Sequence, residues 1–291
     1  MSDKISIIIN CYNGGVYLKE CLDSVEKQTY KNFEVIFWDN KSTDNSKEIF
    51  DKYSNSKFKY YLSNKFTNLS QARNMALNFA TGNYVAFLDT DDIWLKNKLE
   101  KQIKFMKKYN LDISFTNYFL RIEKKNNINI KKYYKVFPKK NLIENLLRNY
   151  FISISTVIFK KKKIEDIYFD EKFHLIGDYD LLMRNILRKL TLGYNEPLAF
   201  IRFHDNNETS KYFLKNIFEN KVWINKNQNK FQNFENYKKL KINYRYNLLK
   251  YLILKKKYHK IFYFFLFLNL EKKIKILVFY IKSQFFNLSI K

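Results

Sequence analysis

The sequence predicts an α/β fold in which a mostly parallel β-sheet is flanked by helices. Within residues 1–110, short apolar runs rich in β-branched and aromatic residues alternate four times with segments whose apolar residues recur at helical spacing. Such alternation is typical of parallel sheets built by right-handed crossovers. In addition, polar side chains follow several of the runs at the point where each predicted strand ends.

The elements of this first half can be assigned in order. We expect strands at 5–9, 33–39, 58–62 and 84–88 and helices at 16–28, 43–54, 69–80 and about 95–109. Thr43-Asp44-Asn45 offers an N-cap for the second helix, and Gly82 is suited to the C′ position that ends the third.

Downstream of residue 110 the predicted strands and helices alternate less regularly. We expect strands at 113–119, 154–159 and 198–203, helices near 141–149 and 180–190, a polar stretch at 124–132, and basic helices from about 210. This pattern predicts a mixed second half on the same sheet. We therefore assign one α/β domain to residues 1–210, with halves 1–110 and 111–210, and a helical basic extension to 211–291.

The charge is concentrated at the end of the chain. The formal net charge is +26; residues 211–291 hold 19 Lys and Arg against 3 acidic residues, whereas residues 1–110 carry +4 and residues 111–210 carry +6. A biased genome composition enriches Lys, Asn and aromatic residues throughout a chain, but it does not confine the excess to one segment. A basic extension indicates an anionic partner, either nucleic acid or a phospholipid surface.

The aromatic run 261–270 lies within this extension. It is ten residues long and flanked by Lys, whereas a membrane-spanning helix needs about 20 apolar residues. Two interpretations remain open: the run lies in a membrane interface with Lys side chains reaching the phosphates, or it packs the extension on the domain. Cys11 and Cys21 form no metal-spaced motif and suit a reducing cytosol, and residues 1–4 do not begin a secretory signal.

Three carboxylates follow the fourth predicted strand, in Asp89-Thr90-Asp91-Asp92. Because the carboxyl ends of parallel strands hold the ligand crevices of open α/β sheets, acids at this point suit a hard divalent cation that also binds phosphate oxygens. The alternative is that these residues turn the chain and that Asp92 caps the following helix.

Other polar groups are expected at the same edge. Tyr12 offers an aromatic face for a base, and Asp39 an acceptor for a ring N–H, although Asp39 also fits an Asx turn into residues 40–42. Arg73, near the start of the third helix, adds a cation for phosphate. Together these residues suit a base, a ribose and a diphosphate.

Four blocks of the chain resemble family 2 glycosyltransferases. They are Ser-Ile-Ile-Ile-Asn-Cys-Tyr-Asn (6–13), Trp-Asp-Asn-Lys-Ser-Thr-Asp (38–44), Gln-Ala-Arg-Asn (71–74) and Ala-Thr-Gly-Asn-Tyr-Val-Ala-Phe-Leu-Asp-Thr-Asp-Asp (80–92). The resemblance implies a Rossmann-like GT-A fold with a nucleotide-binding half at 1–110 and an acceptor half at 111–210. It also implies a nucleotide-diphospho-sugar donor, with a UDP-sugar expected, a divalent metal (Mn²⁺ or Mg²⁺), and inversion at the anomeric carbon.

The resemblance also implies residue roles. It assigns the metal to Asp91, and the donor to Cys11, Tyr12, Asn13, Asp39, Arg73, Asp89 and Thr90. Tyr12 and Asp39 would hold the base and Asp89 the ribose. The chain departs from the family pattern at Asn10, where Pro is common, and at Asn40-Lys41, where an acid and Gly are frequent.

Two further positions complete the expected site. Asp178 matches the family's catalytic base, although Gly177 replaces the Glu that often precedes it; alternatively, Asp178 and Asp180 only serve the start of a helix. His204, in a block that resembles the one closing the donor site, is expected to ligate the metal or touch the diphosphate.

These observations predict an inverting glycosyltransferase that acts on a glycan or lipid-linked acceptor in polysaccharide or lipopolysaccharide synthesis. We expect it to be cytoplasmic, peripheral on the inner face of the cell membrane through residues 211–291, and without a nucleic-acid partner. The alternatives are another nucleotide-sugar enzyme, such as a nucleotidyltransferase, for which a P-loop is missing, and a basic nucleic-acid-binding protein.

Overall fold

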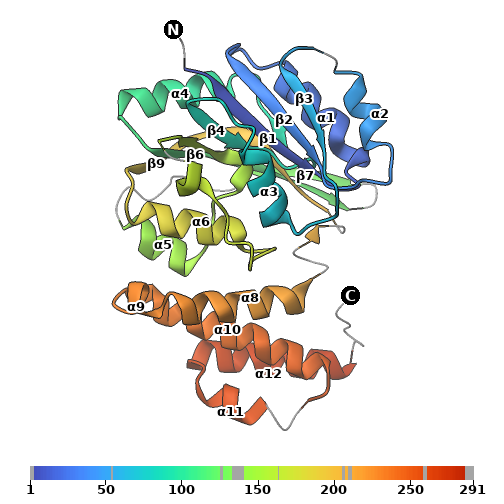
Figure 1. Ribbon diagram of the computed structural model, residues 1–291. Helices are drawn as coiled ribbons and strands as arrows, with labels where there is room; N and C mark the ends of the chain where they lie inside the picture. Colours follow the sequence, from blue (N-terminus) through green and yellow to red (C-terminus); the bar gives the residue numbers. More distant parts are fainter. Residues whose placement is uncertain are drawn as a thin grey trace. The chain divides into compact units, whose positions relative to one another are not determined.

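Figure 1 shows the computed structural model of the chain. It describes residues 3–53, 55–124, 127–132, 141–162, 164–204, 207–208, 212–257 and 261–285. The chain divides into two compact units, one formed by Met1–Lys140 and Phe151–Asp205 and the other by Asn141–Tyr150 and Asn206–Lys291.

The first unit is built on one mixed sheet, as Figure 1 shows. Its parallel part has the order β3 (Phe58–Leu62), β2 (Phe33–Asp39), β1 (Ile5–Cys11) and β4 (Tyr84–Phe87). It continues through β8 (Val157–Lys160), β6 (Ile113–Lys124), β9 (Thr191–Phe203) and β5 (Ile93–Trp94), and β7 (Asn127–Lys132) pairs with β6. The predicted α/β class and the mixed second half are confirmed; antiparallel pairs begin where β4 meets β8.

The strands of the parallel part are buried on both faces. Alternate side chains of β1 and β2, such as Ile7 and Phe37, pack in a core with helices α1 (Gly15–Glu26), α2 (Ser46–Asp51) and α4 (Lys98–Lys108). Helix α3 (Leu69–Leu77) packs on β1 and β2. Each fully buried aliphatic side chain contributes on the order of 1.5–3 kcal/mol, so this core holds the strand ends in place.

The strand register determines which residues lie at the edge of the sheet where the site is expected. Cys11 pairs with Asp39 across β1 and β2, and Ile8 pairs with Phe87 across β1 and β4. The chain after each strand therefore emerges at the same edge, where the polar residues were expected.

Gly82 does not end the third helix as predicted. Helix α3 stops at Leu77 with Asn78 as its C-cap residue. A Cβ on Gly82 would lie 2.7 Å from the backbone oxygen of Lys4 and 2.7 Å from the backbone nitrogen of Ser6. The glycine is thus required by close backbone approach to β1.

Several other boundaries differ from the prediction. The strand expected at 154–159 is a 3₁₀ turn at Ile154–Thr156 followed by β8, the helix expected at 180–190 spans Gly177–Ile186, and β9 begins at Thr191 and not at 198. Helix α2 spans Ser46–Asp51 and ends before the predicted residue 54. Its N-cap residue is Asn45, within the predicted capping segment, but no side chain makes a capping bond; Asp44 accepts from the backbone N–H groups of Gly15 and Ser46. Residues Ile93–Trp94 form β5 against β9, so α4 begins only at Lys98. The polar stretch near 124–132 contains β7, in which alternating Ile128 and Ile130 fit the period of a strand.

The remaining elements of the first unit are short. They are η1 (Ile154–Thr156), η2 (Ile164–Ile167) and α6 (Gly177–Ile186).

The second unit is helical. It contains α5 (Leu142–Arg148), α8 (Phe213–Lys226), α9 (Gln228–Phe231), α10 (Glu235–Leu254), α11 (Ile261–Leu266) and α12 (Leu270–Phe285). Glu144 of α5 accepts from the backbone N–H groups of Glu235 and Asn236, both at 2.8 Å, and so caps α10. Leu249, Ile253, Leu268 and Ile276 form its small core. Within the residues that the structure describes, no helix is both long enough and apolar enough to cross a bilayer.

Candidate active site

The loop after β1 presents Tyr12 to solvent. Asn13 has left-handed backbone (φ 52°), and its side-chain oxygen accepts from the backbone N–H of Thr43 at 2.8 Å. The Tyr12 side chain is 50% exposed, with its ring centroid 4.6 Å from that of Phe66. An exposed aromatic face is therefore held at the edge where a base is expected.

Asp39 at the end of β2 is buried and already engaged within the protein. Its Oδ1 accepts from the backbone N–H of Ser42 at 2.7 Å, which is the Asx turn considered from the sequence, and its Oδ2 accepts from the Tyr60 hydroxyl at 2.6 Å. Each carboxylate oxygen has a second lone pair for a ligand. The turn and a contact with a base are thus compatible.

Cys11 and Thr90 lie on either side of Gly14. The Cys11 side chain is buried, its Sγ lies 3.3 Å from the Ser46 hydroxyl, and burial raises the pKa of the thiol. The thiol thus faces the interior of the protein. A Cβ on Gly14 would lie 2.9 Å from Thr90 Oγ1, so the glycine lets the two loops approach.

Arg73 of α3 is paired with Asp89. Its Nη2 lies 2.7 Å from Asp89 Oδ1, and the guanidinium lies over the Phe169 ring at 5.1 Å. The Arg73 side chain is 6% exposed and that of Asp89 38%. The carboxylate therefore faces the open edge, while the arginine fixes it from behind. A capping box of Asn68 and Gln71 sets the start of α3.

Asp91 and His204 form a second pair. His204 Nε2 lies 3.2 Å from Asp91 Oδ2, and the His204 ring lies 4.8 Å from that of Tyr17. The structure thus brings together the two residues that the sequence assigned to a metal.

Arg202 joins the loops that carry this pair, a contact that we did not predict. Its Nε donates to the backbone oxygen of Asp91 at 2.8 Å, and its guanidinium carbon lies 4.2 Å from the Tyr17 ring centroid. Glu20 and Glu123 accept from its two terminal nitrogens. Arg202 stands in the same block as His204, but the sequence did not indicate which groups its side chain contacts.

Asp92 was considered as a helix cap, and this prediction is wrong. Helix α4 begins at Lys98 with Asn97 as its N-cap residue. Asp92 is buried, accepts from the Ser155 hydroxyl at 2.6 Å and from the backbone N–H of Arg202 at 3.0 Å. Burial and the neighbouring charges of Asp91 and Asp89 raise the pKa of Asp92 well above its usual range.

Asp91 and His204 fit a metal that is shared with phosphate. Among the residues described, no three His, Cys, Asp or Glu side chains cluster as a metal site. A carboxylate and an imidazole nitrogen supply two ligands, and Mg²⁺-like ions at substrate phosphates use few protein ligands and complete their shell with phosphate oxygens and water.

Asp178 lies in the first turn of α6. Ile176 is the N-cap residue and makes no side-chain capping bond, and Asp178 Oδ1 accepts from the Tyr179 backbone N–H at 2.8 Å. Asp180 is buried and bonded to Arg184 Nε at 2.7 Å. The two acids thus differ: Asp180 has a structural partner inside its own helix, whereas Asp178 is partly exposed.

The absence of a side chain at Gly177 has a physical reason. A Cβ at this position would overlap the Ser70 hydroxyl of α3. The segment before α6 is hydrogen-bonded to α3, for example from the Leu69 backbone N–H to His174 Nδ1 at 3.1 Å and from the Phe169 backbone N–H to Asn74 Oδ1 at 2.8 Å. Asp178 is therefore held beside the helix that carries Arg73.

The fold is that of GT-A glycosyltransferases, and the sequence comparisons give the family. Residues 6–191 match the profile of glycosyl transferase family 2, and the chain belongs to this family.

Several relatives are similar over more than half of the chain. The chain is 35% identical over 190 residues to the amylovoran biosynthesis glycosyltransferase AmsB of Erwinia amylovora, covering 62% of each chain. It is 36% identical over 165 residues to the Escherichia coli glucosyltransferase WfgD (57% of this chain, 63% of that one). It is 33% identical over 223 residues to E. coli WfaP (75% and 84%). The chain thus spans less than two thirds of the length of AmsB and WfgD.

Solved structures share the fold. Staphylococcus aureus TarS (residues 1–349) with UDP-GlcNAc superposes with a TM-score of 0.66 at 20% identity, over 96% of this chain and 81% of that one. The mannosyltransferase PcManGT of Pyrobaculum calidifontis, solved with GDP-Man and Mn²⁺, gives a TM-score of 0.62 at 14% identity, over 99% and 88%.

Proposed function

We propose that this protein transfers a sugar from a nucleotide-diphosphate donor to a hydroxyl of a glycan or lipid-linked acceptor, with inversion at the anomeric carbon. The observation that carries the proposal is the gathering of the Arg73–Asp89 and Asp91–His204 pairs at one sheet edge. Asp178 is anchored through α3 to the same part of the unit.

The donor fits this edge in a definite order. Tyr12 stacks on the base, Asp39 accepts from its ring N–H, and Asp89, held by Arg73, accepts from the ribose hydroxyls. A UDP-sugar is the preferred donor, because WfgD and WfaP are named UDP-Glc-dependent enzymes and TarS was solved with UDP-GlcNAc.

The chemistry then needs a base and a stabilised leaving group. Asp178 accepts the proton of the acceptor hydroxyl while the acceptor oxygen bonds to the anomeric carbon and the bond from that carbon to the diphosphate breaks. The nucleoside diphosphate leaves with the electron pair. A divalent cation held by Asp91 and His204 would neutralise the charge on the diphosphate oxygens. Arg202 keeps Asp91 and His204 facing each other.

For the acceptor, we propose a lipid-linked saccharide at the inner surface of the cell membrane. WfgD and WfaP are named for a diphosphoundecaprenol-linked GlcNAc acceptor. In this chain, α12 carries an exposed apolar stripe at helical spacing, formed by Leu270, Ile274, Leu277, Val278 and Ile281.

This stripe suits an anionic lipid surface. Its side chains are 46–74% exposed, and Lys272, Lys273 and Lys275 lie on the same helix. The opposite side of α12 packs in the core of the second unit through Ile276. A helix with an exposed apolar stripe and basic side chains binds in the interface of a bilayer. In α12, Lys275 is paired with Glu271, and Lys272 and Lys273 lie over the rings of Tyr246 and Phe265.

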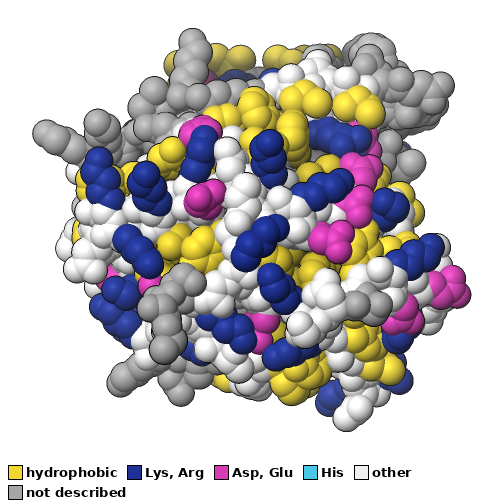
Figure 2. Space-filling view, turned by 90° about the horizontal axis from the view of Figure 1, so that it is seen from above, with side chains coloured by type: hydrophobic (Ala, Val, Ile, Leu, Met, Phe, Trp, Pro, Cys, Tyr) yellow, Lys and Arg dark blue, Asp and Glu magenta, His cyan; other side chains and the backbone are white. Residues whose placement is uncertain are grey.

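On the face drawn in Figure 2, Lys and Arg side chains stand among acidic and apolar side chains.

Donor binding is tested by thermal unfolding with a panel of nucleotide sugars, with and without Mn²⁺. A ligand that binds only the folded state raises the midpoint, by about 2.7 kcal/mol of added stability at a hundredfold excess over Kd. We expect a UDP-sugar with metal to raise it most and Asp91→Asn to abolish the metal effect. No stabilisation by any nucleotide sugar would contradict the donor assignment.

Membrane binding is tested by sedimentation with vesicles containing anionic lipid. Replacing Leu270, Ile274 and Leu277 by Ser is expected to release the protein from the vesicles. Replacing the equally exposed Ile128 and Ile130 of β7 by Ser is the matched control and should leave binding unchanged. Equal partitioning of the two variants would refute binding through α12.

A further inference from the structure

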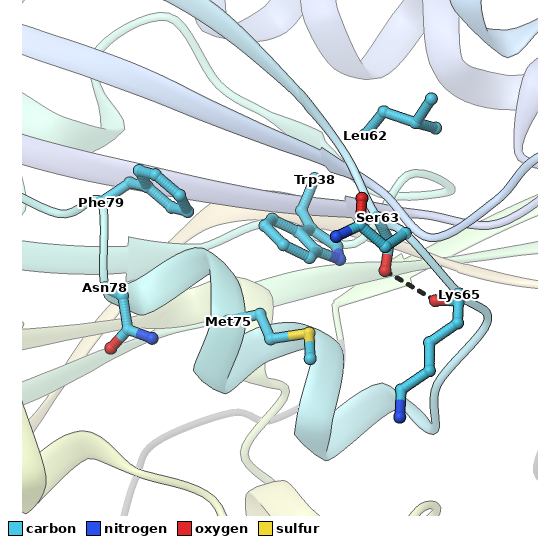
Figure 3. Close-up of a pocket in the computed structure, with 8 residues that line it drawn as sticks. Trp38, Leu62, Ser63, Lys65, Met75, Asn78 and Phe79 are labelled. Carbon is cyan, nitrogen blue, oxygen red and sulfur yellow. Dashed lines mark hydrogen bonds between the residues drawn. The ribbon is translucent and has the colours of Figure 1, made fainter.

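A cavity outside the donor edge carries an inference of its own (Figure 3). It has a volume of about 490 Å³ and lies between the ends of β2 and β3 and helix α3. Its apolar lining comes from Trp38, Leu62, Met75 and Phe79, and Lys65 is among its polar residues. Cavities of this size and composition are typical of small-molecule sites.

The cavity is distinct from the proposed base site. Consecutive residues of a strand point to opposite faces, so Trp38 faces away from the side that carries Asp39. Trp38 instead lies near Phe79, with ring centroids 6.1 Å apart, and Phe79 stacks on Tyr61 at 4.0 Å.

The indole N–H of Trp38 is left without a hydrogen bond. The side chain is 8% exposed, and its Nε1 has no partner among the described residues. A buried donor without an acceptor is costly, and Trp N–H groups usually find one. Figure 3 shows this nitrogen on the side of the ring toward Ser63 and Met75. The flexible Met75 thioether lies beside it, and its movement would open the N–H to a ligand.

Lys65 adds a charge at the same cavity. None of the ion pairs among the described residues involves Lys65, so within that part of the chain its ammonium group has no carboxylate partner. An apolar cavity with one hydrogen-bond donor at its wall and one cation suits a ligand that has an apolar body, a hydrogen-bond acceptor and a negative charge.

We infer that this cavity binds an amphipathic anion, with an aromatic or aliphatic body against Trp38, Met75 and Phe79, an acceptor for the Trp38 N–H, and the negative charge at Lys65. This site is separate from the proposed transfer reaction and does not depend on it.

The test uses 2-naphthoate as the probe and nuclear magnetic resonance of the ¹⁵N-labelled full chain. The chain has three tryptophans, so three indole N–H signals are expected, and Trp38→Phe identifies that of Trp38. Trp94 donates to the Ser155 backbone oxygen and Trp223 is buried in the second unit, so they serve as internal controls. We expect a saturable shift of the Trp38 signal alone. If Trp38→Phe does not fold, Trp94→Phe and Trp223→Phe assign the signal by elimination.

Two comparisons test the charge. Lys65→Gln should weaken 2-naphthoate binding about two- to fivefold, as expected for an exposed ion pair. Lys52→Gln, at an exposed lysine of the same unit, should not. Neutral 2-naphthamide should bind more weakly and be insensitive to Lys65→Gln. The inference is overturned if the Trp38 signal stays unmoved at saturating 2-naphthoate, or if the other two indole signals shift equally.

Discussion

Lys41 occupies left-handed backbone with φ of 70°. This conformation brings the chain from Asp39 into the Ser42 N–H bond that closes the Asx turn. Left-handed backbone costs a residue with a Cβ roughly 1 kcal/mol of stability. A glycine avoids this cost, but part of the gain is offset because glycine loses more conformational entropy on folding.

Lys41→Gly is therefore expected to stabilise the first unit by up to about 1 kcal/mol, measured by chemical unfolding. The control is Lys52→Gly, which removes a lysine at the right-handed C-cap position of α2 and should destabilise. A loss of stability in Lys41→Gly would show that the lysine side chain has a role of its own.

Asp178→Asn tests the proposed base. Asparagine keeps the shape of the side chain but cannot accept the proton, so transfer should fall by at least about 10²–10⁴-fold while the Kd for the donor changes little. Transfer is measured by nucleoside diphosphate release. Glu48→Gln, at an exposed acid of α2, is the control and should keep its activity. Retained turnover in Asp178→Asn would refute the assignment.

For single residues, the sequence predicted which side chains lie together in the site better than it predicted the contacts that position them. Asp91 and His204 were assigned from the family pattern and lie 3.2 Å apart. The supports of the site were missed, because Arg202, Ser155 and Asp92 act through buried contacts between segments far apart in the chain. Propensity and spacing report local structure only, so such contacts leave no signal in one sequence.

Among the elements, β1, β2 and β3 are joined by one buried carboxylate. Glu34 of β2 accepts from Lys4 at 2.9 Å, Lys59 at 3.0 Å, Ser6 at 2.8 Å and Thr81. Burial alone would raise the pKa of Glu34, but the hydrogen bonds from Lys4, Thr81 and Lys59 outweigh it and lower the pKa to about 2.

This shift makes a pH prediction. A carboxyl whose pKa is lower in the folded state stabilises it above pH of about 4.5 and loses that contribution as pH falls toward 2. The full shift corresponds to at most about 3 kcal/mol, and the partial exposure of both lysines reduces it. Glu34→Gln should thus lower the free energy of unfolding by about 1–3 kcal/mol at pH 7 and by little near pH 2. Glu48→Gln, at an exposed acid of α2, should show no such dependence.

Element boundaries were predicted best where the sequence pattern indicates only one kind of secondary structure. The strands of the parallel part lie within a residue or two of their predicted ends, because β-branched runs have no competing helical period. The helix predicted from residue 95 begins three residues later, because Ile93–Trp94 pairs with β9 and pulls the chain into the sheet. That pairing depends on residues about a hundred positions away.

At the scale of the whole molecule, the second unit is not continuous in sequence. The predicted extension began at residue 211, but the second unit also includes Asn141–Tyr150, whose Leu146 and Leu147 are buried. Residues 1–210 as a separate functional domain, with a nucleotide half and an acceptor half, remain a prediction.

Removing the C-terminal helices should therefore do more than remove charge. A chain ending at residue 210 loses the α10 residues that Glu144 caps and the partners of α5. We expect residues 141–150 to become sensitive to limited proteolysis in that chain and to stay protected in the full chain. The site of first cleavage, read by mass spectrometry, decides this, and protection in both chains would contradict it.

The same discontinuity imposes an order of events during synthesis. At about 5–20 residues per second, the roughly hundred residues between the end of α5 and the end of α10 take on the order of 5–20 s to emerge. For that interval α5 is outside the ribosome with its leucines uncovered. The sheet of the first unit is completed within the same interval, when β9 emerges. A nascent chain paused in this window presents a short apolar helix that chaperones recognise, so codons between 150 and 254 are where slow translation would cost yield.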